Sequence, residues 1–216
     1  MKRKISARLP VLLLLTLLLS SCVTARPENA GQAAQTEEPD LEETAGGIPE
    51  RDRSTEKGAD RSGGEHKKGD VIANHQTEIK DFEKNRMKNL GLAAKKINGR
   101  VIKAGEEFSF NRSVGPRTMS RGFRRAVIFK NDEKVKEIGG GICQISTTLY
   151  QAALEAGFEI IERHGHGLEV PYARKGDDAT VYYGRLDLRF VNTSGVDVAL
   201  ECGIGEENVF VSITAV

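Results

Sequence analysis

The stretch "EIGGGICQISTTLYQAAL", Glu137 to Leu154, carries the strongest structural pattern in this 216-residue chain. After the three glycines, apolar residues recur with the spacing of one helix face, and Gly157 ends the pattern as a C-terminal cap. These apolar residues are Ile145, Leu149, Ala152, Ala153 and Ala156. Glycines adopt positive φ angles and turn successive N–H groups inward, where they hold an anion. The stretch therefore predicts a helix that begins at Cys143, directly after a glycine turn.

The segments around this helix favour an antiparallel sheet. Before the glycines, "RRAVIFK" and "KVKEI" flank a turn, as the two strands of a hairpin do. After the helix come five short strand-like runs separated by Gly, Asn and Asp, namely "FEIIERHGH", "ATVYY", "LDLRFV", "VDVALECGI" and "NVFVSITAV". A second helical pattern spans residues 79–97. We expect one α+β domain over residues 75–216, with the helix after the glycine turn packed on a mostly antiparallel sheet.

The first 74 residues do not have the composition of a globular core. Residues 1–21 combine four basic residues with the apolar stretch "LPVLLLLTLLLSS", which is far shorter than the ~20 residues of a membrane-spanning helix and is typical of an export signal. The segment ends like a bacterial lipobox, so Cys22 is predicted to be acylated and to anchor the protein to a membrane. Residues 22–74 are predicted to form a disordered acidic and polar tether. We expect an exported lipoprotein at the cell envelope.

Charge and cysteine content limit the function classes. The net charge is +1, which gives no indication of nucleic-acid binding. Once Cys22 is acylated, only Cys143 and Cys202 remain. A disulfide between these two is one alternative, although the alternation in "VDVALECGI" points Cys202 into the core.

Cys143 has the surroundings that a nucleophilic cysteine needs. The start of a helix favours a thiolate, and the free N–H groups there bind an oxyanion. A base must come from elsewhere, and His164 and His166 lie two residues apart in "ERHGH", on one side if that run is a strand. Asp178 follows in "KGDDAT". The same four side chains are also possible zinc ligands, but no C-x-x-C pair supports a metal, so we expect neither metal nor cofactor.

The block "GGGICQISTTLYQAALEAGFEIIERHGH", followed by "VPYARKGDDATVYYGRLDLRFVN", resembles the VanW family. The resemblance also includes "NGRVIKAGEEFSFNRSVGPRT" and "RGFRRAVI", and so covers nearly the whole predicted domain. It implies a cell-envelope protein linked to peptidoglycan and to glycopeptide (vancomycin) resistance. Some VanW-domain proteins are L,D-transpeptidases that use the cysteine of this block, which is Cys143 here. The family usually has Ser after the second His, where this chain has Gly167.

The resemblance favours an enzyme over a buried structural cysteine. In the expected reaction, the Cys143 thiolate attacks the carbonyl between an L- and a D-centre of a peptidoglycan stem peptide. His166, or else His164, takes the thiol proton and returns it to the leaving amine, while Asp178 orients the imidazole. The alternative is a non-catalytic lipoprotein that binds the envelope.

Five further residues are candidates for contacts with the substrate. Gly140, Gly141 and Gln144 surround the cysteine and are expected to supply donors for the oxyanion. Arg121 and Arg163 are candidates for binding a carboxylate of the stem peptide.

Overall fold

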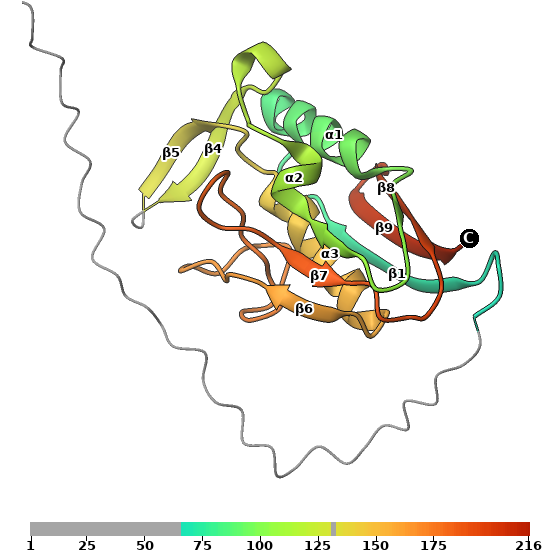
Figure 1. Cartoon of the computed structure of the whole chain (residues 1–216). Helices are drawn as coiled ribbons and strands as arrows, with labels where there is room; N and C mark the ends of the chain where they lie inside the picture. The colour runs from blue at the N-terminus through green and yellow to red at the C-terminus, as the bar shows by residue number, and fades with distance from the viewer. Residues whose placement is uncertain (1–65, 131–132) are drawn as a thin grey trace, which may run out of the picture. The chain divides into compact units, whose positions relative to one another are not determined.

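The computed structural model describes residues 66–130 and 133–216 of the chain (Figure 1). The predicted signal segment, the lipidation site Cys22 and most of the predicted tether lie outside these residues. The described part is an α+β domain with mostly antiparallel sheets, which confirms the predicted fold class. Within it, no helix has the length and the apolar character needed to span a membrane.

The largest sheet has four strands in the order β1-β9-β8-β2, and all its pairings are antiparallel. These strands are β1 (Val71–Glu78), β2 (Val101–Ile102), β8 (Val198–Ile204) and β9 (Asn208–Ala215). A second antiparallel sheet, ordered β3-β7-β6, contains β3 (Glu107–Ser109), β6 (Glu159–Glu162) and β7 (Arg189–Val191). The predicted hairpin is present as β4 (Arg125–Lys130) and β5 (Glu133–Ile138), at the opposite side of Figure 1 from the C-terminus.

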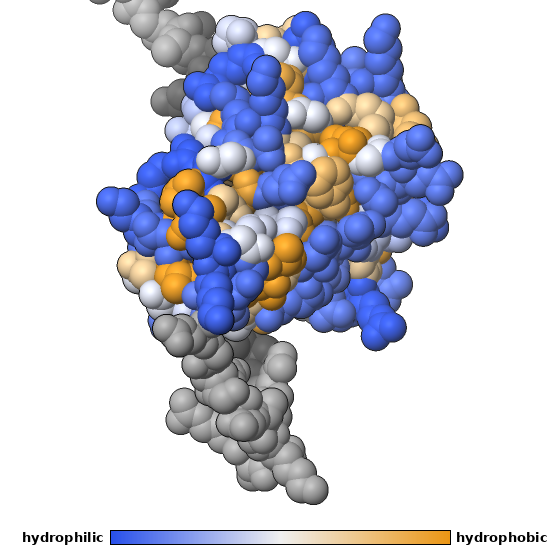
Figure 2. Space-filling view, turned by 90° about the vertical axis from the view of Figure 1, so that its right-hand side faces the viewer, coloured by the Kyte–Doolittle hydropathy of each residue, from blue (hydrophilic) through white to orange (hydrophobic). Residues whose placement is uncertain are grey.

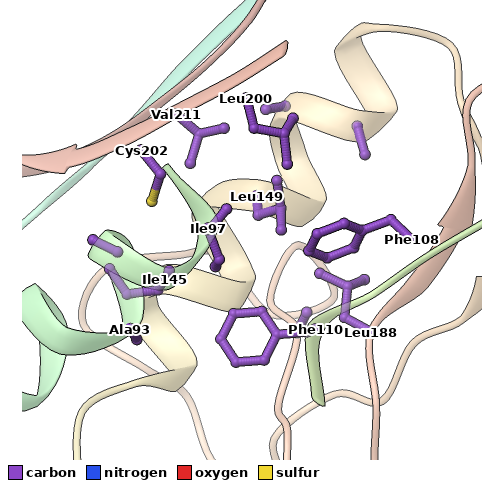
Figure 3. Packing of buried hydrophobic residues seen from close by; sticks show 14 of the residues in the cluster. Ala93, Ile97, Phe108, Phe110, Ile145, Leu149, Leu188, Leu200, Cys202 and Val211 are labelled. Atoms are coloured by element: carbon purple, nitrogen blue, oxygen red, sulfur yellow. The ribbon is translucent and has the colours of Figure 1, made fainter. Parts of the chain in front are cut away.

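Two longer helices pack on the large sheet. Helix α3 (Cys143–Glu155) begins where the glycine pattern predicts and packs against β1 and β9, while α1 (Lys84–Ile97) packs against β8. The other helical elements are α2 (Phe110–Val114) and the 3-10 turn η1 (Met119–Arg121). Figure 3 shows Ile145 and Leu149 of α3 inside the core, with Leu200 and Val211 of the large sheet on one side and the ring of Phe110 on the other. Helix α3 therefore joins both sheets into one core.

The structure differs from the sequence-based expectation near residue 75. Strand β1 begins at Val71, within the predicted tether, because its residues pair with β9 along nearly its whole length. The first helix begins at Lys84 rather than near Ile79, since the Glu83 carboxylate caps it by accepting hydrogen bonds from the backbone N–H groups of Asn85 and Arg86. Ile79 is buried but follows the strand instead of belonging to the helix.

The strand-like runs after α3 do not form one meander. They divide between two sheets, and "ATVYY" forms only isolated bridges, His164 with Thr180 and Tyr182 with Leu186. Regular pairing stops at Glu162, so the two histidines do not lie on one strand.

The outer surface is largely hydrophilic on the face shown in Figure 2, where hydrophobic side chains appear as patches among hydrophilic ones.

Candidate active site

The glycine turn brings the start of α3 against two other segments. Gly141 has φ +97°, and a Cβ atom there would lie 2.7 Å from Cγ of Arg86, so the position needs glycine on both grounds. A Cβ at Gly140 would lie 2.6 Å from the backbone oxygen of Ala126. Asn89, fully buried on α1, donates from Nδ2 to the Gly140 carbonyl at 3.0 Å and to the Arg124 carbonyl at 2.9 Å. The turn is thus held in one position by close packing and by a buried amide.

The Gln144 side chain differs from its expected role as an oxyanion donor. It is fully buried, and its Oε1 accepts a hydrogen bond from Nη2 of Arg86 at 2.5 Å. Its Nε2 donates to Oγ1 of Thr77 at 3.0 Å and to the Glu78 carbonyl at 2.9 Å. Both ends of the amide are therefore used in joining α3 to β1 and α1, because a buried amide has to satisfy its hydrogen bonds internally.

The first turn of α3 also holds the segment that contains Asp178. Ser146 Oγ donates to the Ala179 carbonyl at 2.6 Å, and Thr147 Oγ1 accepts from the Ala179 N–H at 3.0 Å. Thr180 follows, and its Oγ1 lies 3.5 Å from Sγ of Cys143. The hydroxyl groups of Ser146 and Thr147 thus fix the "DDAT" segment beside the cysteine.

His166 lies between Asp178 and Cys143. Its Nδ1–H donates to Oδ2 of Asp178 at 2.5 Å, and its backbone N–H donates to the same oxygen at 2.6 Å. Hydrogen bonding to Cys143 is one of the interactions that raise the pKa of His166. The ring of Tyr172 meets the imidazole edge-on, with centroids 6.5 Å apart. The structure therefore brings Cys143, His166 and Asp178 together in the order thiol, imidazole, carboxylate.

His164 points elsewhere. Its Nε2–H donates to Oε1 of Glu162 at 3.0 Å, and its backbone pairs with Thr180. Gly165 separates the two histidines after the strand has ended, so their side chains do not share a face. Of the two imidazoles, His166 is the one that interacts with the thiol.

Asp178 is 4% exposed and is held from the side opposite His166 by Arg163. Arg163 Nη2 donates to Oδ1 of Asp178 at 3.0 Å, and its Nε donates to the Asp178 carbonyl at 2.5 Å. The same guanidinium lies over the ring of Tyr150, 5.4 Å from the centroid. Arg163, expected to bind substrate, is thus a partner of the carboxylate.

Electrostatics at the three groups favour a thiolate and an imidazolium. Burial alone would raise the pKa of Cys143, but hydrogen bonding and attraction from His166 outweigh burial and lower that pKa. Burial would lower the pKa of His166, but Asp178 and Cys143 raise it to about 9. Burial opposes ionisation of Asp178 as well, yet the side chain and backbone of His166 lower its pKa to about 2.

Two backbone N–H groups beside the sulfur are available as donors. The N–H of Gly140 bonds to the Glu137 carbonyl at 3.3 Å, and that of Gln144 bonds to the Gly141 carbonyl at 3.0 Å. In contrast, the N–H groups of Gly141 and Cys143 have no acceptor among residues 66–130 and 133–216. Unpaired N–H groups at a helix start can bind anions, so the backbone N–H groups still free for an oxyanion are those of Gly141 and Cys143, not those of Gly140 and Gln144.

The two cysteines differ in their surroundings, and the structure bears on the disulfide between them. Cys143 and Cys202 are both free thiols, so the disulfide alternative does not apply. Cys202 is buried in the core, as its strand alternation predicts, and burial raises its pKa to about 12. In the described part of the chain, no three His, Cys, Asp or Glu side chains are grouped so as to hold a metal ion.

Arg121 and Arg117 occupy different surroundings. Arg121, an expected carboxylate ligand, is exposed and extends its Nη2 to the Val114 carbonyl at 3.4 Å. Arg117 was not among the predicted residues, yet its pKa is influenced by Cys143. No local pattern in "SVGPRT" separates Arg117 from other surface arginines, because its surroundings come from segments distant in sequence.

The site residues lie within a region that matches known proteins. The family model described as "VanW like protein" matches residues 85–214, more than half of the chain. The chain belongs to the VanW family. It is 41% identical over 121 residues to the uncharacterized protein YoaR of Bacillus subtilis, a match that covers 56% of this chain and 40% of YoaR.

A second VanW-family relative is a named resistance protein. The chain is 32% identical over 151 residues to the vancomycin B-type resistance protein VanW of Enterococcus faecalis, which covers 67% of this chain and 55% of that protein. The chain thus spans about half the length of these curated relatives. No solved structure matches it significantly.

Proposed function

We propose that this VanW-family chain is a cysteine acyltransferase that acts on peptidoglycan stem peptides in the manner of an L,D-transpeptidase. The observation that carries the proposal is the contact series Cys143, His166, Asp178, with the carboxylate 2.5 Å from the imidazole Nδ1. A thiol activated by an oriented imidazole is the arrangement of nucleophilic cysteine enzymes on unrelated folds. Anchoring at the cell envelope through an acylated Cys22 belongs to the same proposal.

In the first half of the reaction, the Cys143 thiolate attacks the carbonyl carbon between an L- and a D-residue and forms a C–S bond. The negative charge moves to the carbonyl oxygen, where the N–H groups of Gly141 and Cys143 stabilise it. The imidazolium of His166 then gives its proton to the leaving amine as the C–N bond breaks. A thioester on Cys143 and a free amine result.

In the second half, the amine of another stem peptide attacks the thioester. His166 removes a proton from this amine, the C–S bond breaks, and the thiolate is regenerated with a new amide cross-link. Water in place of the amine gives hydrolysis. Asp178 keeps Nδ1 of His166 protonated, so that the other ring nitrogen faces the sulfur.

Gly167 does not weaken this assignment. The backbone and Nδ1 of His166 are both held by Asp178, without help from residue 167. A Cβ at Gly167 would have no described atom within 4 Å, so the serine usual in the family also fits at this position.

The proposal is tested by the muropeptides of cells in which the chain is replaced by the Cys143→Ala variant. We expect cross-links formed at an L-centre, or the corresponding trimmed stems, to decrease. A Cys202→Ala variant serves as the matched control, because Cys202 is a buried thiol of the core. Unchanged muropeptides in Cys143→Ala would favour a non-catalytic envelope-binding protein.

A further inference from the structure

Arg117 presents a free guanidinium edge in the neighbourhood of the candidate nucleophile. Its Nε and Nη2 atoms are buried and have no hydrogen-bond partner among the described residues. Its Nη1 donates to the Gly115 carbonyl at 3.1 Å. Nε and Nη2 together form the side of the guanidinium that binds both oxygens of a carboxylate in parallel. The unpaired part of Arg117 is therefore the part suited to a carboxylate.

The position of Arg117 links it to Cys143. Its Cβ and Cγ pack against Gly139, the first residue of the glycine turn, where an added Cβ would lie 3.0 Å from both atoms. Burial lowers the pKa of Arg117 to about 10, and attraction from Cys143 and Asp187 opposes that effect. Asp187 does not pair with the guanidinium, since its oxygens accept from Ser109 Oγ at 2.5 Å and from the Asn111 N–H at 2.8 Å.

Two aromatic rings hold the faces of the guanidinium and leave its edge for a ligand. The guanidinium carbon lies 5.5 Å from the centroid of Phe110 and 5.6 Å from that of Tyr183. Phe110 is fully buried, whereas Tyr183 is 47% exposed and lies in the turn between the bridged residues Tyr182 and Leu186. Because the free edge has no contact with solvent, a ligand reaches it only when a neighbouring side chain moves. Of the two rings, Tyr183 is the one that is exposed enough to move.

A buried charge without a counter-ion among the described residues is costly, and charged groups in perturbed surroundings cluster at functional sites. We propose that Arg117 binds the terminal carboxylate of the stem peptide whose scissile carbonyl is attacked by Cys143. This inference rests on the proposed function and names the feature of the substrate that is recognised. The carboxylate belongs to the D-residue after the scissile bond, about one residue (~3.8 Å between Cα atoms) from the reacting centre. Arg117 thus takes the role first expected for Arg121 and Arg163.

The test measures binding to the full chain carrying Cys143→Ala, which prevents turnover. Two synthetic stem tetrapeptides are titrated by calorimetry, one with a free C-terminal carboxylate on its D-residue and one with a carboxamide there. We expect the carboxamide to bind at least about 10-fold more weakly, as loss of a charge-assisted bidentate contact implies. Adding Arg117→Gln should bring the two affinities within about 3-fold of each other.

Three further measurements keep the test decisive. Arg121→Gln, the matched surface variant, should keep the full discrimination, and Arg117→Lys should keep part of it, because a single ammonium does not make the bidentate contact. Thermal unfolding shows whether each variant folds. Equal affinity for both peptides, no binding of either peptide, or discrimination that survives Arg117→Gln would each overturn the assignment.

The outcomes separate this inference from the proposed reaction. If Arg117 discriminates between the carboxylate and carboxamide peptides but Cys143→Ala leaves the muropeptides unchanged, the carboxylate site is supported and the proposed reaction is contradicted. If Cys143→Ala alters the muropeptides but the two peptides bind equally, the proposed reaction is supported and the carboxylate site is contradicted.

Discussion

The carboxylate of Asp178 offers the sharpest test of the candidate site. Asp178→Asn keeps the size of the side chain and removes its charge. In the folded protein Oδ2 accepts two hydrogen bonds from His166, at 2.5 Å from Nδ1 and 2.6 Å from the backbone N–H. The hydrogen bond from the ring is the largest of the interactions that raise the pKa of His166, and Cys143 contributes to the same effect.

The size of the effect follows from that contact. A hydrogen bond to a charged group contributes ~1.5–3 kcal/mol, and ~1.4 kcal/mol corresponds to one pKa unit. Asp178→Asn should therefore lower the pKa of His166 from about 9 to a value roughly one to two units lower. The pKa of Cys143 should rise in parallel, since hydrogen bonding and attraction from His166 are what lower it.

Two measurements report these changes. The titration of His166 is followed by NMR, and the rate of Cys143 alkylation by iodoacetamide is followed against pH with mass-spectrometric assignment of the site. Asp177→Asn is the matched control, because this neighbouring carboxylate is exposed and its side chain makes no hydrogen bond within the described residues. A His166 midpoint in Asp178→Asn that stays within about half a unit of the wild type would refute the proposed coupling.

Three other outcomes are expected. Leu149→Ala should lower the free energy of unfolding by ~2–5 kcal/mol in urea titrations, because this α3 side chain is fully buried. Leu154 is 43% exposed on the same helix, so Leu154→Ala should change that free energy by less than ~1 kcal/mol. Iodoacetamide at neutral pH should modify Cys143 in the folded protein, but Cys202 only after unfolding, since burial raises the pKa of Cys202 to about 12; equal labelling of both would contradict the packing. The pKa of Asp178 is about 2 in the folded state against 3.8 ordinarily, so its stabilising contribution is complete above pH 3.8 and is lost as the pH falls through 2. Between pH 5 and pH 2, the free energy of unfolding of the wild type should therefore fall by about 2 kcal/mol more than that of Asp178→Asn, as measured by chemical unfolding. Identical acid profiles of the two proteins would refute this expectation.

The sequence patterns that predicted structural elements correctly depend on interactions between residues close together in the sequence. Glycines followed by a helical apolar face predicted the start of α3 at Cys143, because turn geometry and helix burial are both short-range properties. The β4–β5 hairpin and the inward position of Cys202 were predicted for the same reason. In contrast, β1 was missed because its pairing partner, β9, lies at least 130 residues away in the sequence.

The sequence by itself determined the α+β class, the family, and the residue types needed for thiol chemistry. Only the tertiary structure decided which of the two histidines lies beside the thiol. Regular strand pairing ends before both of them, and of the two rings only that of His166 is hydrogen-bonded to Asp178. Tertiary packing also placed Gln144 and Arg163 in supporting contacts, and it left the guanidinium edge of Arg117 without a partner in the described part of the chain. The physical reason is the same in each case: a polar side chain acts through the groups it meets in space, and those groups come from distant parts of the chain.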